Sequence, residues 1–344
     1  MRAAAIPEWW LVILAALAAA LLSAGMTRMI RPLLSKHALA KPNARSSHRI
    51  PTPQGAGIAV IAATLVAAGG IFAGGTGSNS NFPVALFAAT LFMAAMGFAD
   101  DMKPIPVLPR LLLQAIAVGA IVLAIPDDVR IVTILPLPIE RGFVLFVGLW
   151  LVNLVNFMDG IDWMTVAEIV PVTAAIAMLG LFGEVSPAVA IVAAALCGAM
   201  IGFAPFNRPI AAIFLGDVGS LPIGLLLGWC LLHLASHRHM TAALLLPLYY
   251  LADATLTLLR RMVRGEPFWA AHRSHFYQRA TDNGFSVMQV VSEIFVLNLA
   301  LAILAAISIK VASPGADAIL VALGAGAVIF VMLRFSRPRG AETA

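Results

Sequence analysis

Residues 82–101 read FPVALFAATLFMAAMGFADD, an apolar run that ends on two adjacent aspartates, Asp100 and Asp101. Acidic clusters occur twice more: residues 159–162 read DGID, and residues 216–220 read GDVGS. Placing a carboxylate inside a membrane or at its edge costs free energy. Three acidic clusters beside apolar spans therefore indicate chemistry or transport. The acidic loops are therefore the place to look for function.

The composition of the chain is that of a membrane protein. Hydrophobic residues make up 61% of the 344 residues and charged residues only 11%, which excludes a water-soluble surface. Apolar runs long enough to cross about 30 Å of hydrocarbon lie near residues 9–27, 55–74, 83–99, 107–125, 142–158, 164–182, 187–205, 218–235, 240–259, 286–309 and 316–334. They predict an all-α polytopic membrane protein with about eleven transmembrane helices, in a single domain over residues 1–344.

The basic residues predict the orientation of the chain. With the N-terminus outside, the inner loops hold 17 of the 22 lysines and arginines, so the positive-inside rule selects N-out, C-in. This orientation places the three acidic clusters and residues 272–275, HRSH, on one cytoplasmic face. Anionic lipids at that face explain the basic balance, and the sequence contains no nucleic-acid-binding motif.

The end of the fifth predicted span carries a stripe of oxygen ligands. Asn153, Asn156 and Asp159 follow one another at intervals of three residues, within about 120° of arc on a helix. Together with Asp217 they offer the hard ligands that Mg²⁺ prefers. The alternative is that these groups only cap the helix and bond its neighbours. For the Asp100–Asp101 pair, the alternative is an interfacial anchor at a helix end.

Two further segments suggest phosphate binding. Residues 216–220 open the eighth span, where free amides and the positive helix end favour a phosphate, although glycine and serine also open helices as turn and cap residues. In residues 272–275, two imidazoles and a guanidinium could grip a pyrophosphate. A solvated basic loop is the alternative there.

Read in order, these clusters resemble the polyprenyl-phosphate N-acetylhexosamine-1-phosphate transferase family, which includes the enzymes that initiate O-antigen and the phospho-MurNAc-pentapeptide translocase. The motifs that carry the resemblance are PNARSSH at 42–48 with PTP at 51–53, Asp100–Asp101 with Arg110 and Gln114, NLVNFMDGID at 153–162 with Glu168, Asn207 with FLGDVGS at 214–220, and HRSHFYQ at 272–278. Each motif alone is weak, but all of them occur in the family's order on one predicted membrane face. The span layout and the HRSH form look closest to the O-antigen-initiating branch.

The resemblance implies transfer of a sugar-1-phosphate from a UDP-N-acetylated hexosamine to undecaprenyl phosphate, with release of UMP, at the cytoplasmic face of a bacterial inner membrane. It implies Mg²⁺, with Mn²⁺ as a substitute, held by Asn156 and Asp217. The remaining candidate site residues are Asp100, Asp101 and Asp159 for catalysis, Asp162, Asn207, Phe214, His272, Arg273 and His275 for the nucleotide and diphosphate, and Asn43, Arg45 and His48 in the first loop. The expected partners are the two substrates, membrane lipids and a second copy of the chain in a homodimer.

The sequence also departs from the family pattern. Ala40, Gln54 and Ala56 stand where many relatives carry aspartate, arginine and glycine, and Trp163 replaces the usual glycine after Asp162. These departures bear on how the substrate fits the site. The aspartates of the family pattern are unchanged. The sugar, the pathway and the choice between direct attack and a covalent intermediate stay open.

The rival class of function is an ion-coupled secondary transporter. Such a carrier has a similar number of spans and also contains intramembrane polar residues, but it binds its ions near the bilayer midplane. The acidic clusters of this chain instead lie at span ends on one predicted face, where a soluble nucleotide could meet a lipid. Their position favours an enzyme.

Overall fold

The computed structural model describes residues 9–40, 51–74, 83–267 and 272–339. The helices are α1 (Trp9–His37), α2 (Gly57–Ala73), α3 (Val84–Met102), α4 (Val107–Leu123), α5 (Leu137–Met158), α6 (Met164–Leu181), α7 (Pro187–Asn207), α8 (Asp217–Ser236), α9 (Met240–Leu245), α10 (Leu248–Val263), α11 (Phe276–Asp282), α12 (Val287–Val311) and α13 (Pro314–Phe335). The only strands in the described ranges are β1 (Leu39–Ala40) and β2 (Thr52–Pro53), which pair antiparallel. The prediction of an all-α membrane protein is confirmed.

Eight of these helices are long and apolar enough to cross a membrane, and α2 and α4 are shorter apolar helices. Ten predicted spans therefore correspond to helices of the described chain, and α1 runs well past its predicted end at residue 27. The predicted span at 240–259 is wrong as a single helix. It is divided into α9 and α10 at Pro247, which lacks the amide hydrogen that a continuous helix needs.

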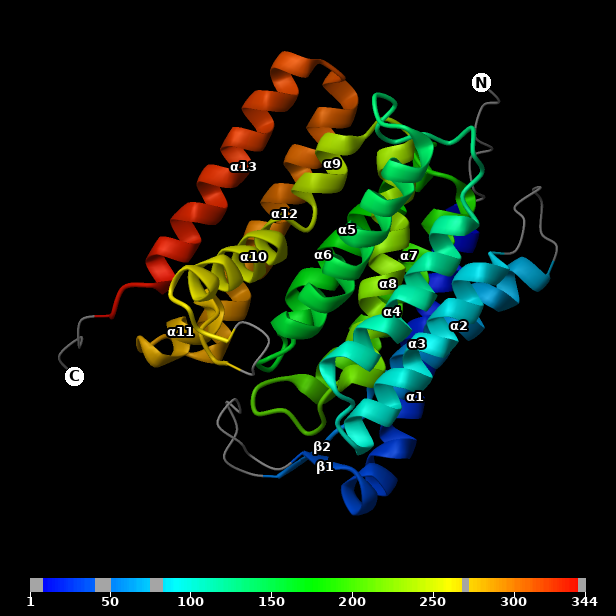
Figure 1. The fold of residues 1–344 in the computed structure, drawn as a ribbon. Coiled ribbons are helices and arrows are strands. Elements are labelled where there is room, and N and C mark those ends of the chain that lie inside the picture. The colour runs from blue at the N-terminus through cyan, green and yellow to red at the C-terminus, as the bar shows by residue number, and fades with distance from the viewer. Residues whose placement is uncertain (1–8, 41–50, 75–82, 268–271, 340–344) are drawn as a thin grey trace.

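The helices α6, α7 and α8 form the centre of the bundle. In the most apolar stretch of each, 67%, 78% and 72% of the residues are buried, against 28% in α13. A helix that is apolar all round belongs in the interior of a bundle, which agrees with this arrangement. The helices α1 and α2 cover one side of α7, while α3 and α5 pack against α8 (Figure 1).

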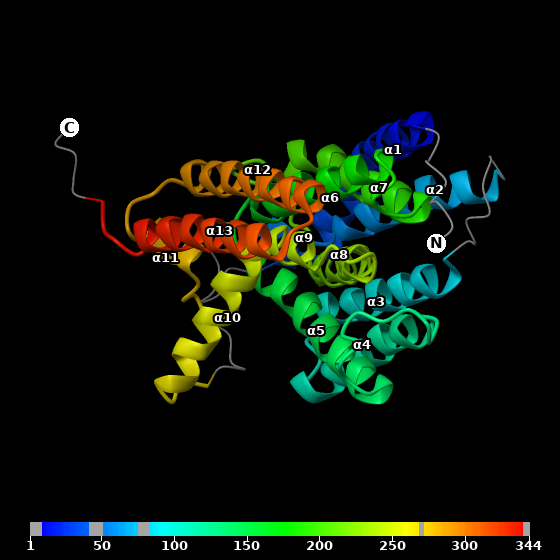
Figure 2. The same cartoon turned by 90° about the horizontal axis from the view of Figure 1, so that it is seen from above.

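The break after α9 changes the direction of the chain. Seen from above, α10 runs outwards from the body of the bundle, whereas α12 and α13 pack side by side along it (Figure 2). The short helix α11 follows α10 and contacts α10, α12 and α13. Residues at the free side of α10 are therefore not covered by the rest of the bundle, and several of its apolar side chains are exposed.

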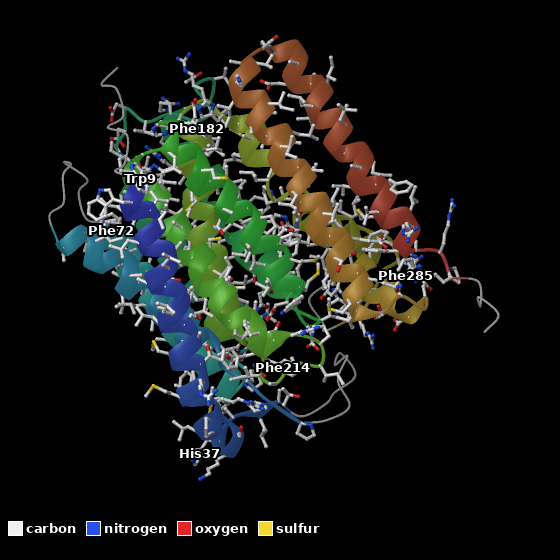
Figure 3. All side chains as sticks on the ribbon, turned by 180° about the vertical axis from the view of Figure 1, so that it is seen from behind. Trp9, His37, Phe72, Phe182, Phe214 and Phe285 are labelled. Carbon is white, nitrogen blue, oxygen red and sulfur yellow. The ribbon has the colours of Figure 1, made fainter. Side chains whose placement is uncertain are left out.

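The two ends of the bundle differ in character. Phe214 and His37 lie at one end, while Trp9, Phe72 and Phe182 lie at the other (Figure 3). Trp9 and Phe182 are exposed, as expected for aromatic side chains in a membrane interface. The end that carries Phe214 also carries the C-terminus of α3 and the N-terminus of α8, where the predicted acidic clusters lie. The N-out, C-in orientation stays a prediction.

Candidate active site

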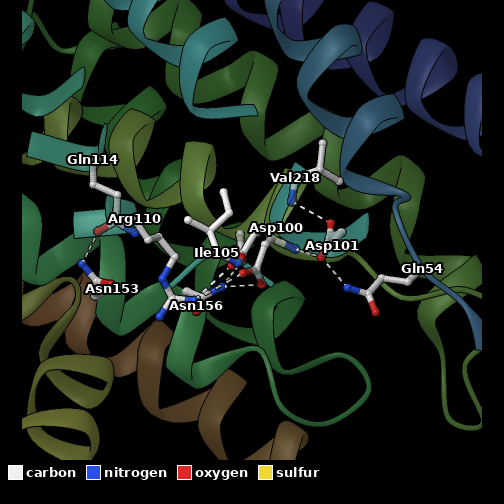
Figure 4. A network of polar contacts seen from close by, with 11 residues as sticks. Gln54, Asp100, Asp101, Ile105, Arg110, Gln114, Asn153, Asn156 and Val218 are labelled. Carbon is white, nitrogen blue, oxygen red and sulfur yellow. Dashed lines mark hydrogen bonds and ion pairs between the residues drawn. The ribbon is translucent and has the colours of Figure 1, made fainter. Parts of the chain in front are cut away.

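Four helix ends meet in a polar network that contains four of the predicted site residues, Asp100, Asp101, Asn156 and Asp217 (Figure 4). Asp100 lies in the last turn of α3, Asn156 lies in the last turn of α5, and Asp217 begins α8. Asn156 donates a hydrogen bond from Nδ2 to Asp217 Oδ1 at 2.7 Å. Arg110, in the first turn of α4, lies 3.0 Å from Asp100 and 4.0 Å from Asp217. Residues far apart in the sequence thus converge as the resemblance implies.

Glycines permit the close approach of helices at this point. A Cβ atom on Gly97 of α3 would lie 2.3 Å from the carbonyl oxygen of Asp217, and one on Gly57 of α2 would lie 2.2 Å from Gly219 Cα. Real Cβ atoms do not come so close to backbone, so any side chain at either position would push α8 away. Gly57 and Gly97 therefore fix the distance between Asp217 and the end of α3.

Asp101 caps the N-terminus of α8. Its carboxylate accepts hydrogen bonds from the amides of Asp217 at 2.9 Å and Val218 at 3.0 Å, and the Gln54 side chain donates a third bond. The sequence suggested a phosphate at the start of this helix, with capping as the alternative; in the structure these two amides bond to Asp101. A carboxylate at this end of a helix is stabilised by its unpaired amides. Asp101 acts here by positioning α8.

Asp100 and Asp217 differ in accessibility. Asp100 accepts bonds from the Ile105 amide and Arg110, and only 6% of its side chain is exposed. Asp217 leaves 27% of its side chain exposed and interacts directly with Asp100. Two carboxylates so close together repel each other, and a cation beside them would relieve the repulsion. Asp217 is the member of the pair that a ligand from solution can reach.

The donor set fits a magnesium ion better than a softer metal. Within the described residues, no three or more His, Cys, Asp or Glu side chains are grouped as a metal site. Asp100, Asp217 and Asn156 instead offer two carboxylates and one amide. Mg²⁺ commonly uses one or two carboxylates and completes its shell with waters and substrate phosphates, so this incomplete set is compatible with it.

The loops after α5 and α7 are joined by the residues predicted for the uridine site. Asp162 accepts a bond from the Ala211 amide at 2.9 Å, and Asn207 accepts one from the Trp163 amide at 2.8 Å. Asn207 also donates to the Ile213 carbonyl at 3.1 Å. Asp162 and Asn207 are buried, so both shape the loops from within. Any contact with a nucleotide would come in addition to this role.

Phe214 is held through its backbone. Its amide donates to the Pro53 carbonyl at 2.8 Å, and its carbonyl accepts from the amides of Gly55 and Ala56. The side chain is only partly buried, at the end of the bundle that carries the acidic residues (Figure 3). Gln54 pairs with Phe214 in a short parallel bridge. The segment before α2 therefore fixes the loop that leads into Asp217.

Trp163, one of the departures from the family pattern, adopts a left-handed backbone with φ 63° and ψ 1°. Glycine takes this conformation without the steric cost that a side chain adds. The indole compensates by donating to the Ala204 carbonyl at 2.6 Å. The unusual residue therefore ties the loop after α5 to α7.

Asp159 lies in the same loop and is partly buried. Burial, together with the charges of Asp101 and Asp162, raises its pKa to about 6 and outweighs the hydrogen bond that it accepts from Thr165, which lowers the pKa. Asp159 thus belongs electrostatically to the acidic cluster. Its amide donates to the Asn156 carbonyl at 3.3 Å, but among the described residues its carboxylate bonds to neither the Asn156 side chain nor Asp217.

Residues 272–275 are anchored by a residue that the sequence argument missed. Asp253 of α10 accepts bonds from the His275 ring at 3.1 Å and from the amides of Phe276 and Tyr277 at 3.0 and 3.1 Å. It therefore caps α11 and pairs with a buried imidazole. The signal was present in the sequence: a lone aspartate within the apolar run 248–259 is costly unless it has partners.

The histidine segment also contacts the acidic loop. The Tyr277 hydroxyl donates to the Phe157 carbonyl at 3.2 Å, and a Cβ on Gly160 would lie 2.1 Å from that hydroxyl oxygen. Arg273 pairs with Asp282 at 3.1 Å and donates to Thr281, so a diphosphate would have to replace these partners. The rings of His272 and His275 are tilted by 33° to each other, with their centroids 4.9 Å apart. The predicted loop candidates Asn43, Arg45 and His48 lie outside the described residues.

Comparison with known proteins identifies the family and several relatives of this chain. Residues 83–235, which contain all three acidic clusters, match the model of glycosyl transferase family 4. The phospho-N-acetylmuramoyl-pentapeptide-transferase of Streptococcus gordonii is 30% identical over 222 residues, which cover 60% of this chain and 67% of that relative. The decaprenyl-phosphate N-acetylglucosaminephosphotransferase of Mycobacterium tuberculosis is 29% identical over 321 residues, covering 82% and 78%.

A third relative matches a similar share of the chain. The probable undecaprenyl-phosphate N-acetylglucosaminyl 1-phosphate transferase of Bacillus subtilis is 25% identical over 275 residues, covering 76% of this chain and 74% of that relative. All three relatives are named as transferases, and the names of two of them include a polyprenyl phosphate.

Proposed function

The chain belongs to glycosyl transferase family 4, and on that premise we propose that it transfers an N-acetylhexosamine-1-phosphate from its UDP derivative to undecaprenyl phosphate. The observation that carries the proposal is the meeting of Asp100, Asn156 and Asp217 at one end of the bundle. The relatives named for polyprenyl-phosphate N-acetylglucosamine transfer support the lipid acceptor and the amino sugar. The UDP donor and O-antigen initiation come from the motif resemblance.

In the proposed reaction an oxygen of the lipid phosphate attacks the sugar-bearing phosphorus of the donor. The new phosphorus–oxygen bond gives undecaprenyl-diphospho-sugar, and the bond to UMP breaks. Both reactants are anionic, so the site must neutralise charge as it spreads over the phosphoryl oxygens. Bound Mg²⁺ or Mn²⁺ would supply that neutralisation, with Asp217 and Asn156 as its protein ligands.

The other side chains of the site have separate roles in the proposed reaction. Asp100 would take the proton of the lipid phosphate, and Arg110, which lies 3.0 Å from its carboxylate, would orient it. Asp101 holds the start of α8 so that Asp217 faces Asp100. His272, Arg273 and His275 would hold the diphosphate, Arg273 after exchanging its bond to Asp282. Phe214 would stack on the uracil, beside the loops that Asp162 and Asn207 join.

Transport is the less favoured function. The acidic residues of the network lie in the first or last turns of α3 and α8, which is not where an ion-coupled carrier places its binding site. We place the site at the cytoplasmic face of a bacterial inner membrane, because the basic loops mark that face.

The direct test is a transferase assay with the purified full chain. The protein in detergent would be incubated with Mg²⁺, undecaprenyl phosphate and one UDP-sugar at a time. The donors to compare are UDP-N-acetylglucosamine, UDP-N-acetylgalactosamine, UDP-glucose and UDP-MurNAc-pentapeptide. We expect UMP release with an N-acetylated hexosamine, and none without lipid or with the Asp217→Ala variant. Absence of UMP with every donor, from a protein that stays monodisperse, would overturn the proposal.

A further inference from the structure

A basic pocket lies apart from the carboxylate network. It has a volume of about 240 Å³ and lies between α10 and α11, with Glu266 and Ser274 also in its lining. Its lining includes Arg260, Arg261, Arg264, Arg279 and Glu266. Four guanidinium groups and one carboxylate leave a net positive charge in a small space. The proposed transferase chemistry assigns no role to these arginines.

The arginines of the pocket are incompletely paired. Arg261 pairs with Glu266 at 2.7 Å and donates to the Pro267 carbonyl, but its buried Nε has no partner among the described residues. The described part of the chain gives no ion-pair partner to Arg260, Arg264 or Arg279. Four guanidinium groups that share one carboxylate repel one another, and an anion with several oxygens would satisfy them. A phosphate has both the charge and the geometry.

The helix that carries the pocket also exposes an apolar surface. Leu256, Leu259, Met262 and Val263 of α10 are 46%, 49%, 52% and 89% exposed. Thr257, Arg260, Arg261 and Arg264 of the same helix line the pocket. This helix runs outwards from the bundle (Figure 2), which agrees with the large exposed fraction of these apolar side chains. An amphipathic helix with arginines beside exposed apolar residues is typical of a membrane interface.

We propose that this pocket binds the phosphate of an anionic phospholipid whose acyl chains lie along the apolar side of α10. Acyl chains would cover the exposed leucine, methionine and valine side chains, while the headgroup would neutralise the arginines. A free phosphate would leave the apolar side chains uncovered. The inference stands on the membrane location of the chain and does not depend on the proposed transferase reaction.

The position of the pocket separates it from the acceptor of the proposed reaction. Arg110 is the arginine that pairs with Asp100 in the catalytic network, and no pocket arginine does so in the described structure. Along α10 the pocket arginines lie seven to eleven residues beyond Asp253, about 10–16 Å on a helix. Asp253 in turn anchors His275, and Ser274 lines the pocket. A bound headgroup would therefore order the segment that carries the predicted diphosphate ligands.

The test measures lipid retention by native mass spectrometry and thermal stability in detergent. The full chain would be mixed with phosphatidylglycerol, phosphatidylcholine, inorganic phosphate or undecaprenyl phosphate, each alone and in competition with phosphatidylglycerol. We expect retention of phosphatidylglycerol with a rise in Tm, and little effect of phosphatidylcholine or inorganic phosphate. The double variant Arg260→Gln/Arg264→Gln should bind phosphatidylglycerol at least about tenfold more weakly.

A matched control and three adverse outcomes keep the test decisive. Arg337→Gln removes an exposed arginine outside the pocket and should bind as the parent does. Arg279→Gln is the single variant to use if the double variant is not monodisperse. Equal loss in Arg337→Gln would overturn the proposal, as would unchanged binding in the pocket variants. Displacement of phosphatidylglycerol by undecaprenyl phosphate but not by other lipids would assign the pocket to the acceptor instead.

Discussion

The amide of Asp217 donates a hydrogen bond to Asp101 Oδ1 at 2.9 Å, so one member of the aspartate pair on α3 fixes the residue proposed to hold the metal. Its neighbour Asp100 faces Arg110 instead. Adjacent aspartates on one helix therefore point to different partners. This division makes their roles separable by substitution.

Asp101→Ala removes the cap of α8 and should lower the free energy of unfolding by about 0.5–2 kcal/mol, the usual range for losing an N-cap. Because Asp217 is then less well held, the Mg²⁺ concentration that gives half-maximal UMP release should rise. Thermal melting and a Mg²⁺ titration of the parent and the variant check both effects. Asp127→Ala, at an exposed loop position, is the control and should change neither quantity.

Asp100 and Asp217 should respond differently to metal. Asp100→Asn keeps the size of the side chain but removes its basicity, so we expect UMP release to fall by about a hundredfold or more and not to recover at high Mg²⁺. Asp217→Asn should weaken metal binding, and added Mg²⁺ should restore part of its rate. The measurement is the rate of UMP release against Mg²⁺ concentration for both variants.

Two further outcomes would count against this division of roles. If the parent turned over in excess EDTA, the reaction would not require a metal. If both Asp100→Asn and Asp217→Asn reacted at the parental rate, neither carboxylate would be catalytic, and the transporter alternative would be favoured. The monodispersity of each variant in detergent must match that of the parent before its rate is compared.

Asp159 predicts a pH-dependent contribution to stability. Burial raises its pKa to about 6 from 3.8, so the folded protein binds this proton more tightly than the unfolded chain does. Its contribution to stability is therefore complete below about pH 4 and is lost as the pH rises through about 6. Asp159→Asn stays neutral, so relative to the parent it should gain stability between pH 5 and pH 8, by up to about 3 kcal/mol.

Thermal melts of the parent and Asp159→Asn at several pH values test this expectation. The difference in Tm between the two proteins should grow as the pH is raised and should be small near pH 4. Asp128→Asn, an exposed substitution, controls for the general effect of pH. A difference that does not vary with pH would show that the Asp159 carboxyl titrates normally.

The sequence predicted the part of the site that depends on helix ends. Asp100, Asn156 and Asp217 each lie in the first or last turn of an apolar helix, so topology alone brought them to one face. Asp101 was expected in the same site, but the bonds from the amides of Asp217 and Val218 depend on how α3 meets α8. No spacing within the chain encodes that contact.

The missed features are of the same long-range kind. Asp162 meets Ala211, and Asn207 meets Trp163, across two loops that are 44 residues or more apart in sequence. The break at Pro247 left a local signal, but the hydropathy of residues 240–259 outweighed it in the prediction of a single span. Hydropathy locates the apolar segments, whereas hydrogen bonds between them depend on packing that is set by glycines such as Gly97.

Asp253 supplies the last prediction, because its carboxylate organises residues 272–277 without belonging to them. It accepts five hydrogen bonds, including those from His275 and the amides of Phe276 and Tyr277. Asp253→Asn would turn an NH₂ group towards some of these donors, which should lower the free energy of unfolding by about 1–3 kcal/mol.

Because Asp253→Asn also displaces His275, it should raise KM for the UDP-sugar more than it lowers kcat, since the proposed role of His275 is to bind the diphosphate. Thr257→Val, which removes only one of the five bonds, should show a much smaller change in KM. Steady-state rates of UMP release across UDP-sugar concentrations separate the two parameters, and a fall in kcat at unchanged KM would place Asp253 and His275 in the chemical step instead.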